Sequence, residues 1–121
     1  FSADLASEIY AGADFLLMPS KSEPCGLSQL IAMRYGTIPI VRETGGLVDT
    51  VPPINTETLD GRGFTFKVFN AHDMLGAIER AVAFYGDKTK LSAFRTRIMK
   101  YDSSWKIPAD TYMGIYNELV N

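Results

Sequence analysis

Two short apolar runs on either side of a helical segment constrain the fold of this chain most strongly. The runs are residues 14–18, which Pro19 ends, and residues 38–41. Apolar runs of this length, bounded by Gly or Pro, are typical of strands buried on both faces of a parallel sheet. Between them, residues 27–35 carry apolar side chains at helical spacing, and Gly36 stands where a left-handed C-cap belongs. This order predicts a right-handed βαβ unit.

The remaining segments predict one further strand and four further helices. The strand is expected at residues 63–66 and the helices at residues 2–11, 70–85 and 91–98 and from Pro108 onwards. Asn70 and Asp73 have the spacing of a reciprocal N-cap for the helix that starts there. The apolar stripe of that helix is expected at Leu75, Ile78, Val82 and Tyr85. Residues 44–63 are punctuated by Gly and Pro and are expected to form mostly loop.

The sequence therefore predicts an α/β fold, as part of a Rossmann-like parallel-sheet domain with a C-terminal helical tail. Pro39 lies inside the second apolar run and has no amide hydrogen, so we expect a strand end or an unpaired position there. Three short strands make a narrow sheet. Neighbouring strands are therefore expected outside this chain.

Composition excludes several classes of function. The 121 residues are 46% hydrophobic and 21% charged, which is typical of one globular domain. The net charge of -2 argues against nucleic-acid or membrane binding driven by bulk charge. One Cys and one His exclude a disulfide framework and a Cys/His zinc cluster. No apolar stretch approaches the ~20 residues of a membrane-spanning helix, so we expect a cytoplasmic chain, and the absence of an initiator Met suggests a piece of a longer protein.

Residues 23–28 carry the most specific chemical signal. They lie where the first strand ends and the next helix begins, and ligands bind at this edge of open α/β sheets. The amides of Gly26, Leu27 and Ser28 are expected among the unpaired N–H groups of the helix start, where they can hold a phosphate. Glu23 can accept hydrogen bonds from sugar hydroxyls or stabilise developing positive charge. A helix cap beside a solvated carboxylate explains the same residues, and one Gly is weaker evidence than a glycine-rich phosphate loop.

Five motifs with consistent spacing run through nearly the whole chain. They are Pro19-Ser20-x-x-Glu23-Pro24-Cys25-Gly26-Leu27-Ser28-Gln29, Ala32-Met33-x-Tyr35-Gly36-Thr37-x-Pro39, Thr44-Gly45-Gly46-Leu47-x-Asp49-Thr50-Val51, Gly63-Phe64-x-Phe66 and Asp102-x-Ser104-Trp105. Together they resemble the glycogen and starch synthase family, and its bacterial glycogen synthase branch most closely. The resemblance implies the two-domain GT-B fold. It also implies retaining transfer of glucose from ADP-glucose, or from UDP-glucose in some members, to the non-reducing end of an α-1,4-glucan.

The resemblance further implies roles for individual residues. Glu23 is expected to contact the donor glucose and to serve catalysis. Cys25, Gly26, Leu27 and Ser28 are expected to surround the sugar and the phosphates, largely with main-chain groups. Neither a metal ion nor another cofactor is expected, because the helix N-terminus and basic side chains neutralise the diphosphate.

Thr44, Gly45 and Gly46 follow the second predicted strand at the same sheet edge. The family match favours a loop packed close to the donor, and a turn that needs a positive φ is the alternative. Many related GT-B enzymes carry a second Glu, eight positions after the first, to hold the ribose. Here that position is Ile31, which favours the glycogen and starch synthase branch.

The resemblance begins well inside the C-terminal domain of the family. The N-terminal domain, with its lysine-and-glycine donor motif and catalytic histidine, is absent from this chain. The Arg and Lys that bind the donor phosphates are expected upstream of residue 1. We therefore interpret residues 1–121 as the C-terminal part of the donor-binding domain, with the N-terminal domain as its partner and no activity of its own.

Other residues carry less specific signals. Cys25 at a helix start could act as a nucleophile, but no His, Asn or Asp stands at a recognisable spacing, which favours a pocket-lining thiol. His72 is expected at the surface. For one run of cations a solvated basic face is favoured over a glucan contact: Lys88, Lys90, Arg95, Arg97 and Lys100. Four aromatic residues are expected to dock the terminal helices on the core rather than to form a carbohydrate platform: Tyr101, Trp105, Tyr112 and Tyr116.

Three other functions stay open at this point. A stand-alone module that binds nucleotide sugars is one, and an initiator Met directly before Phe1 would favour it. A GT-B glycosyltransferase with another sugar donor is the second, although Ile31 and Cys25 argue against it. A flavodoxin-like signalling domain shares the βαβ order but explains none of the motif spacing.

Overall fold

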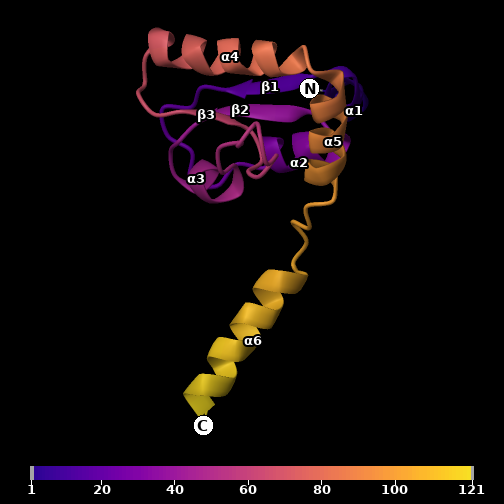
Figure 1. The fold of residues 1–121 in the computed structure, drawn as a ribbon. Helices are drawn as coiled ribbons and strands as arrows, with labels where there is room; N and C mark the ends of the chain where they lie inside the picture. The colour runs from indigo at the N-terminus through magenta and orange to yellow at the C-terminus, as the bar shows by residue number, and fades with distance from the viewer. Residues whose placement is uncertain (1, 121) are drawn as a thin grey trace.

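Three parallel strands form the centre of the structure, a computed structural model that describes residues 2–120 (Figure 1). The strands are β1 (Phe15–Met18), β2 (Ile38–Arg42) and β3 (Phe64–Phe66). They lie in the order β1-β2-β3, and both pairings are parallel. The predicted α/β class and all three predicted strands are therefore confirmed.

Six helices accompany these strands within residues 2–120. They are α1 (Ala3–Gly12), α2 (Ser28–Tyr35), α3 (Gly46–Thr50), α4 (Ala71–Tyr85), α5 (Lys88–Met99) and α6 (Lys106–Val120). α4 runs along one face of the sheet, α2 and α3 lie on the other side, and α6 stands away from the rest (Figure 1). α5 packs against both α2 and α4. None of the six is long and apolar enough to cross a membrane.

Pro39 occupies the central strand without breaking it. Ile38 donates its amide toward β1, to the carbonyl of Asp14 at 3.0 Å, so the nitrogen of Pro39 faces β3. The pairing of β2 with β3 begins only at Ile40, which lies opposite Phe64. The missing donor therefore falls just before the second ladder starts, as the sequence predicts.

Most of the core lies between the sheet, α4 and α5. The ring of Phe84 lies 5.7 Å from that of Phe64 and 5.9 Å from that of Phe94, centroid to centroid, in edge-to-face arrangements. Such pairs stabilise beyond their buried area. A second, smaller cluster joins Val41 of β2 to Leu47 of α3. The larger cluster fixes α4 and α5 on the sheet, and the smaller one fixes the segment that follows β2.

The buried face of α4 differs from the predicted stripe. Three residues of the helix are buried: Ala77, Ala81 and Phe84. Leu75 and Val82 are 49% and 62% exposed, and only Ile78 of the predicted stripe packs against the core. Alanine lets the helix approach β3 closely, and periodicity gives alanine less weight than the large apolar residues. The predicted stripe is therefore wrong at Leu75 and Val82.

The N-terminus of α4 is capped on one side as predicted. Asn70 accepts a hydrogen bond from the amide of Asp73 at 2.7 Å. The reciprocal half of the cap is wrong, because the Asp73 carboxylate accepts from the amides of Lys67 and Val68 at 2.8 and 2.6 Å instead. These two backbone hydrogen bonds hold the pKa of Asp73 below its ordinary value. Asp73 thereby ties the segment after β3 to the start of α4.

Helix α3 forms inside the segment that is predicted to be loop. It has five residues, and its N-cap, Gly45, offers no side-chain cap. A helix of this length is not stable by its own propensity. Its stability comes from burial of Leu47 and of Val51, which follows the helix. A pattern of so few residues carries no readable periodicity, which is why the prediction misses it.

The aromatic residues of the tail do not dock on the core. Within α6 no described residue is buried, and Tyr112 and Tyr116 stack only on each other, with centroids 6.4 Å apart. Trp105 is 79% exposed. The docking prediction is wrong for these three residues, since the segment before α6 carries the helix away from the sheet (Figure 1). Tyr101 alone packs against the core.

The cations of α5 have partners on other segments of the chain. Arg95 forms an ion pair with Asp14, and Lys90 forms one with Glu57 at 3.3 Å. Both ion pairs lie at the surface, because 37% of the Lys90 side chain and 30% of the Arg95 side chain stay exposed, and Lys100 is exposed as expected. The ion pairs bind α5 to the segment before β1 and to the loop before β3.

Candidate functional site

The predicted site residues lie at the carboxyl edge of the sheet, on two loops and on the first residues of the helices that follow them, Ser28 and Gly46. Residues 19–27 join β1 to α2, and residues 43–45 join β2 to α3. The loops meet through their backbones, because the amide of Gly46 donates to the carbonyls of Glu23 and Pro24 at 3.2 and 3.1 Å. The structure therefore brings the two groups of predicted site residues into direct contact.

Two glycines permit this contact. Gly45 has a φ of 50°, and a Cβ there would overlap the carbonyl oxygen of Glu23. A Cβ at Gly46 would lie 2.7 Å from the Cα of Cys25. The turn with a positive φ that the sequence offers as an alternative is thus present. It also packs so tightly that any side chain at either glycine displaces the loop carrying Glu23.

Gln29 ties the end of the first loop to α3. Its side chain is fully buried. Its Nε2 lies 3.0 Å from the carbonyl of Cys25, 2.9 Å from that of Gly26 and 3.1 Å from the hydroxyl of Thr50. Thr50 in turn donates to the carbonyl of Gly46 at 2.8 Å. One buried amide therefore links both loops to the helices that follow them.

Arg42 ties the beginning of the first loop to the sheet. Its Nη1 donates to the carbonyl of Lys21 at 2.9 Å and to that of Ser20 at 3.4 Å, and its Nε donates to the carbonyl of Lys67 at 3.1 Å. Its guanidinium also lies 5.5 Å from the ring centroid of Phe69. Arg42 thus joins the segments that follow β1 and β3.

In the first loop, the backbone carbonyls and the backbone amides differ in their hydrogen bonding. Six of its carbonyls accept hydrogen bonds from Arg42, Gly46 or Gln29: Ser20, Lys21, Glu23, Pro24, Cys25 and Gly26. In contrast, no amide of residues 25–30 donates to an acceptor within the described part of the chain. α2 begins at Ser28 behind Leu27, which provides no side-chain cap. Carbonyls held by the protein and amides left free are the arrangement that binds an anion at a helix N-terminus.

The side chains at this edge are partly accessible. Glu23, Ser28 and Thr44 are half-buried, and Leu27 is 68% exposed. Cys25 is exposed, and within residues 2–120 its thiol contacts only the carbonyl of Gly26, at 3.6 Å. No base within residues 2–120 is hydrogen-bonded to the thiol, which favours a pocket-lining role over a nucleophile.

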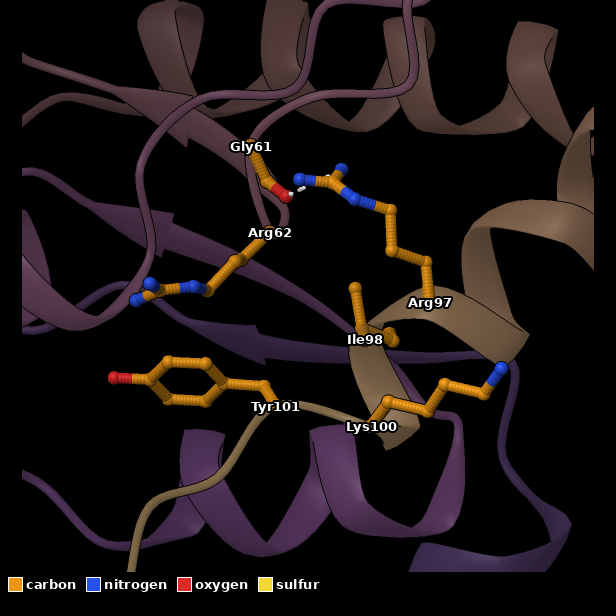
Figure 2. A pocket seen from close by; sticks show the side chains of 6 residues that line it. All are labelled: Gly61, Arg62, Arg97, Ile98, Lys100 and Tyr101. Carbon is orange, nitrogen blue, oxygen red and sulfur yellow. Dashed lines mark hydrogen bonds between the residues drawn. The ribbon is translucent and has the colours of Figure 1, made fainter. Parts of the chain in front are cut away.

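A separate pocket of about 210 Å³ lies between α5 and the loop before β3 (Figure 2). Its lining residues are Gly61, Arg62, Arg97, Ile98, Lys100 and Tyr101. Figure 2 shows Arg97 reaching the carbonyl of Gly61, at 3.3 Å, while the Arg62 guanidinium lies 3.7 Å from the ring centroid of Tyr101. Arg62 also donates to the carbonyl of Thr50 at 3.1 Å. The protein engages both arginines, so they stabilise the loop.

Sequence reasoning missed Gln29 and Arg42 as parts of the site. Gln29 is a polar residue that directly precedes the apolar residues of a predicted helix. Arg42 is a cation directly after a predicted buried strand. Both patterns suggest a polar side chain that serves the backbone at the sheet edge. Neither pattern says which carbonyls it reaches. His72, by contrast, is exposed on α4 as expected.

Comparison with known proteins gives a consistent result. The family model described as "Glycosyl transferases group 1" matches residues 2–94. Glycogen synthases from Anoxybacillus flavithermus and Geobacillus thermodenitrificans are 58% and 55% identical to this chain over 120 residues, which is 99% of the chain in both cases. The chain spans 25% of the length of each of these relatives.

Two solved structures share the fold. The catalytic domain of Starch Synthase IV from Arabidopsis thaliana, bound to ADP and acarbose, matches 98% of this chain and 25% of its own, with a TM-score of 0.87 and 38% identity. Sucrose-phosphate synthase from Thermosynechococcus elongatus matches 99% of this chain and 29% of its own, with a TM-score of 0.67 and 27% identity. The resemblance to glycogen and starch synthases that the motifs indicate is confirmed.

Proposed function

Because this chain belongs to the glycosyl transferases group 1 family, we propose that it forms part of a glucan synthase that uses ADP-glucose. The whole enzyme transfers glucose to the non-reducing end of an α-1,4-glucan, with retention at the anomeric carbon. Residues 1–121 form the C-terminal part of its donor-binding domain, and an N-terminal domain completes the site. The chain spans only a quarter of its relatives' length, which supports a segment that is inactive alone.

One observation carries this proposal: the carbonyls of the loop before α2 accept hydrogen bonds from the protein, whereas the amides of residues 25–30 donate to no acceptor within residues 2–120. A helix N-terminus with free amides favours a negatively charged group such as a diphosphate. Glu23 lies on the same loop and precedes these amides by two residues or more. A carboxylate and an anion site on one short loop match the sugar and the diphosphate of a nucleotide sugar.

The chemistry follows from where charge develops. Cleavage of the bond between the glucosyl carbon and the diphosphate places positive charge on the sugar and negative charge on the leaving ADP. In the proposed site, Glu23 stabilises the positive charge. The amides of Gly26, Leu27 and Ser28 stabilise the leaving diphosphate. Groups fixed in place before the reaction are effective because they need no reorganisation in the transition state.

The remaining predicted residues form the walls of this site. Cys25 lines the sugar pocket with its exposed thiol. Thr44, Gly45 and Gly46 support the loop from behind, through the contact between Gly46 and Glu23. We propose that the α2 N-terminus and basic side chains outside this chain neutralise the diphosphate, and that the enzyme works in the cytoplasm.

The proposal is tested on a complete enzyme. Residues 1–121 replace the matching segment of the Anoxybacillus flavithermus glycogen synthase, and we call the product the reconstituted synthase. Glucose transfer to glycogen is measured with ADP-glucose and with UDP-glucose, and the anomeric configuration of the new linkage is read by NMR.

The proposal expects a new α-1,4 linkage and a higher kcat/KM with ADP-glucose than with UDP-glucose. A reconstituted synthase that unfolds cooperatively, yet transfers no glucose from either donor, contradicts it. Transfer of another sugar, when its nucleotide sugar replaces ADP-glucose in the assay, would favour another GT-B glycosyltransferase.

A further inference from the structure

The side chain of Arg42 reaches two segments, the one that follows β1 and the one that follows β3. It ends β2, the central strand, and β1 and β3 lie on either side. Its Nη1 donates to the carbonyls of Ser20 and Lys21 after β1, and its Nε donates to that of Lys67 after β3. No other side chain within residues 2–120 bonds to the carbonyl of Ser20 or of Lys21.

The guanidinium group is suited to this position. It is planar and presents donors in several fixed directions, whereas the ammonium of lysine is a single point of charge on a flexible stem. Nη1 and Nε of Arg42 use two of these directions, and the ring of Phe69 lies 5.5 Å from the group. A lysine could reach one of the two segments, and it would leave the other without its donor.

The two ends of the loop are held independently. Gln29 and Gly46 hold the carbonyls of Glu23, Pro24, Cys25 and Gly26. In the described part of the chain, Arg42 alone supplies side-chain donors to the segment that precedes Glu23. Loss of Arg42 therefore frees the approach to Glu23 and leaves the amides at the start of α2 in place.

We propose that Arg42 is a positioning residue for glucosyl transfer, which sets the place of Glu23 through the carbonyls of Ser20 and Lys21. This inference rests on the proposed function. It assigns Arg42 to turnover and not to donor binding, because the groups that hold the diphosphate do not depend on it. An interaction made only in the transition state changes kcat, whereas uniform binding changes KM.

The test compares variants of the reconstituted synthase. Arg42→Ala is expected to lower kcat roughly 10- to 100-fold with an unchanged KM for ADP-glucose, since a misplacement of about 1 Å costs on the order of 100-fold. Arg42→Lys is expected to have an intermediate kcat. Millimolar guanidinium chloride is expected to restore part of the kcat of Arg42→Ala but not that of Glu23→Gln.

The matched control is Arg80→Ala. Arg80 also donates to a backbone carbonyl, that of Thr65 in β3 at 2.7 Å, and within residues 2–120 it makes no hydrogen bond to the loop that carries Glu23. Melting temperatures are measured for both variants. If the role of Arg42 is merely structural, Arg42→Ala and Arg80→Ala should lose equal amounts of kcat when they lose equal amounts of melting temperature. Guanidinium should then not restore the kcat of Arg42→Ala.

The outcomes separate this inference from the proposed function. If the parent reconstituted synthase transfers glucose and Glu23→Gln has a lowered kcat, an Arg42→Ala variant as active as Arg80→Ala overturns the role of Arg42 and leaves the proposed function standing. An Arg42→Ala variant with a raised KM and an unchanged kcat also overturns it. If the parent transfers no glucose, both the proposed function and the role of Arg42 are overturned.

Discussion

The amide of Gly46 donates to the carbonyl of Glu23 at 3.2 Å, and this bond joins the loops that follow β1 and β2. The same amide lies 3.1 Å from the carbonyl of Pro24. One N–H group thus holds the backbone on which the proposed catalytic carboxylate stands. The position of Glu23 therefore depends on the loop that follows β2 as well as on the loop that carries Glu23.

Gly45→Ala is expected to disable the site. A Cβ at this position, with its φ of 50°, would overlap the carbonyl oxygen of Glu23. The strained backbone costs about 1–3 kcal/mol of stability, and the displaced loop lowers kcat of the reconstituted synthase. Gly114→Ala is the control, since nothing lies within 4 Å of a Cβ there. Urea unfolding and kcat check the prediction, and a Gly45→Ala variant with parental values for both would contradict it.

Gln29→Leu is expected to weaken donor binding. The substitution removes the donor from the partly buried carbonyls of Cys25 and Gly26. A buried polar group without a partner costs about 1–3 kcal/mol, and the free amides at the start of α2 lose their fixed place. Thr50→Val removes only the hydroxyl that Gln29 contacts and should cost less. The KM for ADP-glucose and the free energy of unfolding are measured, and a larger effect of Thr50→Val would argue against this account.

Asp73 is expected to make stability depend on pH in the acid range. Backbone hydrogen bonds from Val68 and Lys67 hold its pKa below the ordinary value of 3.8. A lowered pKa in the folded state means that the contribution is fully present above about pH 3.8. It is lost as the pH falls below that value, through the lower pKa of the folded state.

Asp73→Asn should therefore lower the melting temperature at neutral pH and flatten its fall in acid. Asp49→Asn is the control, because the side chain of Asp49 is exposed and accepts no hydrogen bond within residues 2–120. Melting curves between pH 2 and pH 7 give the comparison, the interval over which carboxylates titrate. Identical acid branches for Asp73→Asn and the parent chain would contradict the capping role.

Deletion of residues 103–121 is expected to leave the α/β part intact. No described residue of α6 is buried, and Trp105 is 79% exposed. The truncated chain should therefore unfold at the melting temperature of the full chain, as measured by circular dichroism. It should also self-associate less, because deletion removes exposed apolar surface. A clear fall in melting temperature would mean that α6 packs on the sheet.

The fold was predictable where one strong pattern acts on its own. Continuous apolar runs locate β1 and β2, and Gly36 correctly marks the end of α2 with a φ of 82°. The face of α4 was not predictable from periodicity, because the helix approaches the sheet through Ala77 and Ala81. α3 was not predictable because tertiary burial of Leu47, and not local propensity, stabilises it.

The location of the candidate site was predictable from the sequence, but the side chains that hold its loops in place, Gln29 and Arg42, were not. The position after a parallel strand and before a helix indicates where Glu23 and the free amides lie. Gln29 and Arg42 act on carbonyls of other segments, at distances that no local pattern encodes. The glycines at positions 45 and 46 are readable as a turn, but the reason for both is the close approach of the first loop.

Glu23→Gln in the reconstituted synthase tests the central claim most directly. The variant keeps the shape of the side chain and removes its charge. We predict a kcat lowered roughly 100- to 1,000-fold, the range for loss of one group that stabilises charge in the transition state, at an unchanged KM for ADP-glucose. Glu57→Gln, which alters an exposed carboxylate paired with Lys90, should retain the parental kcat. A Glu23→Gln enzyme with the parental kcat would contradict the assignment of this loop as the donor site.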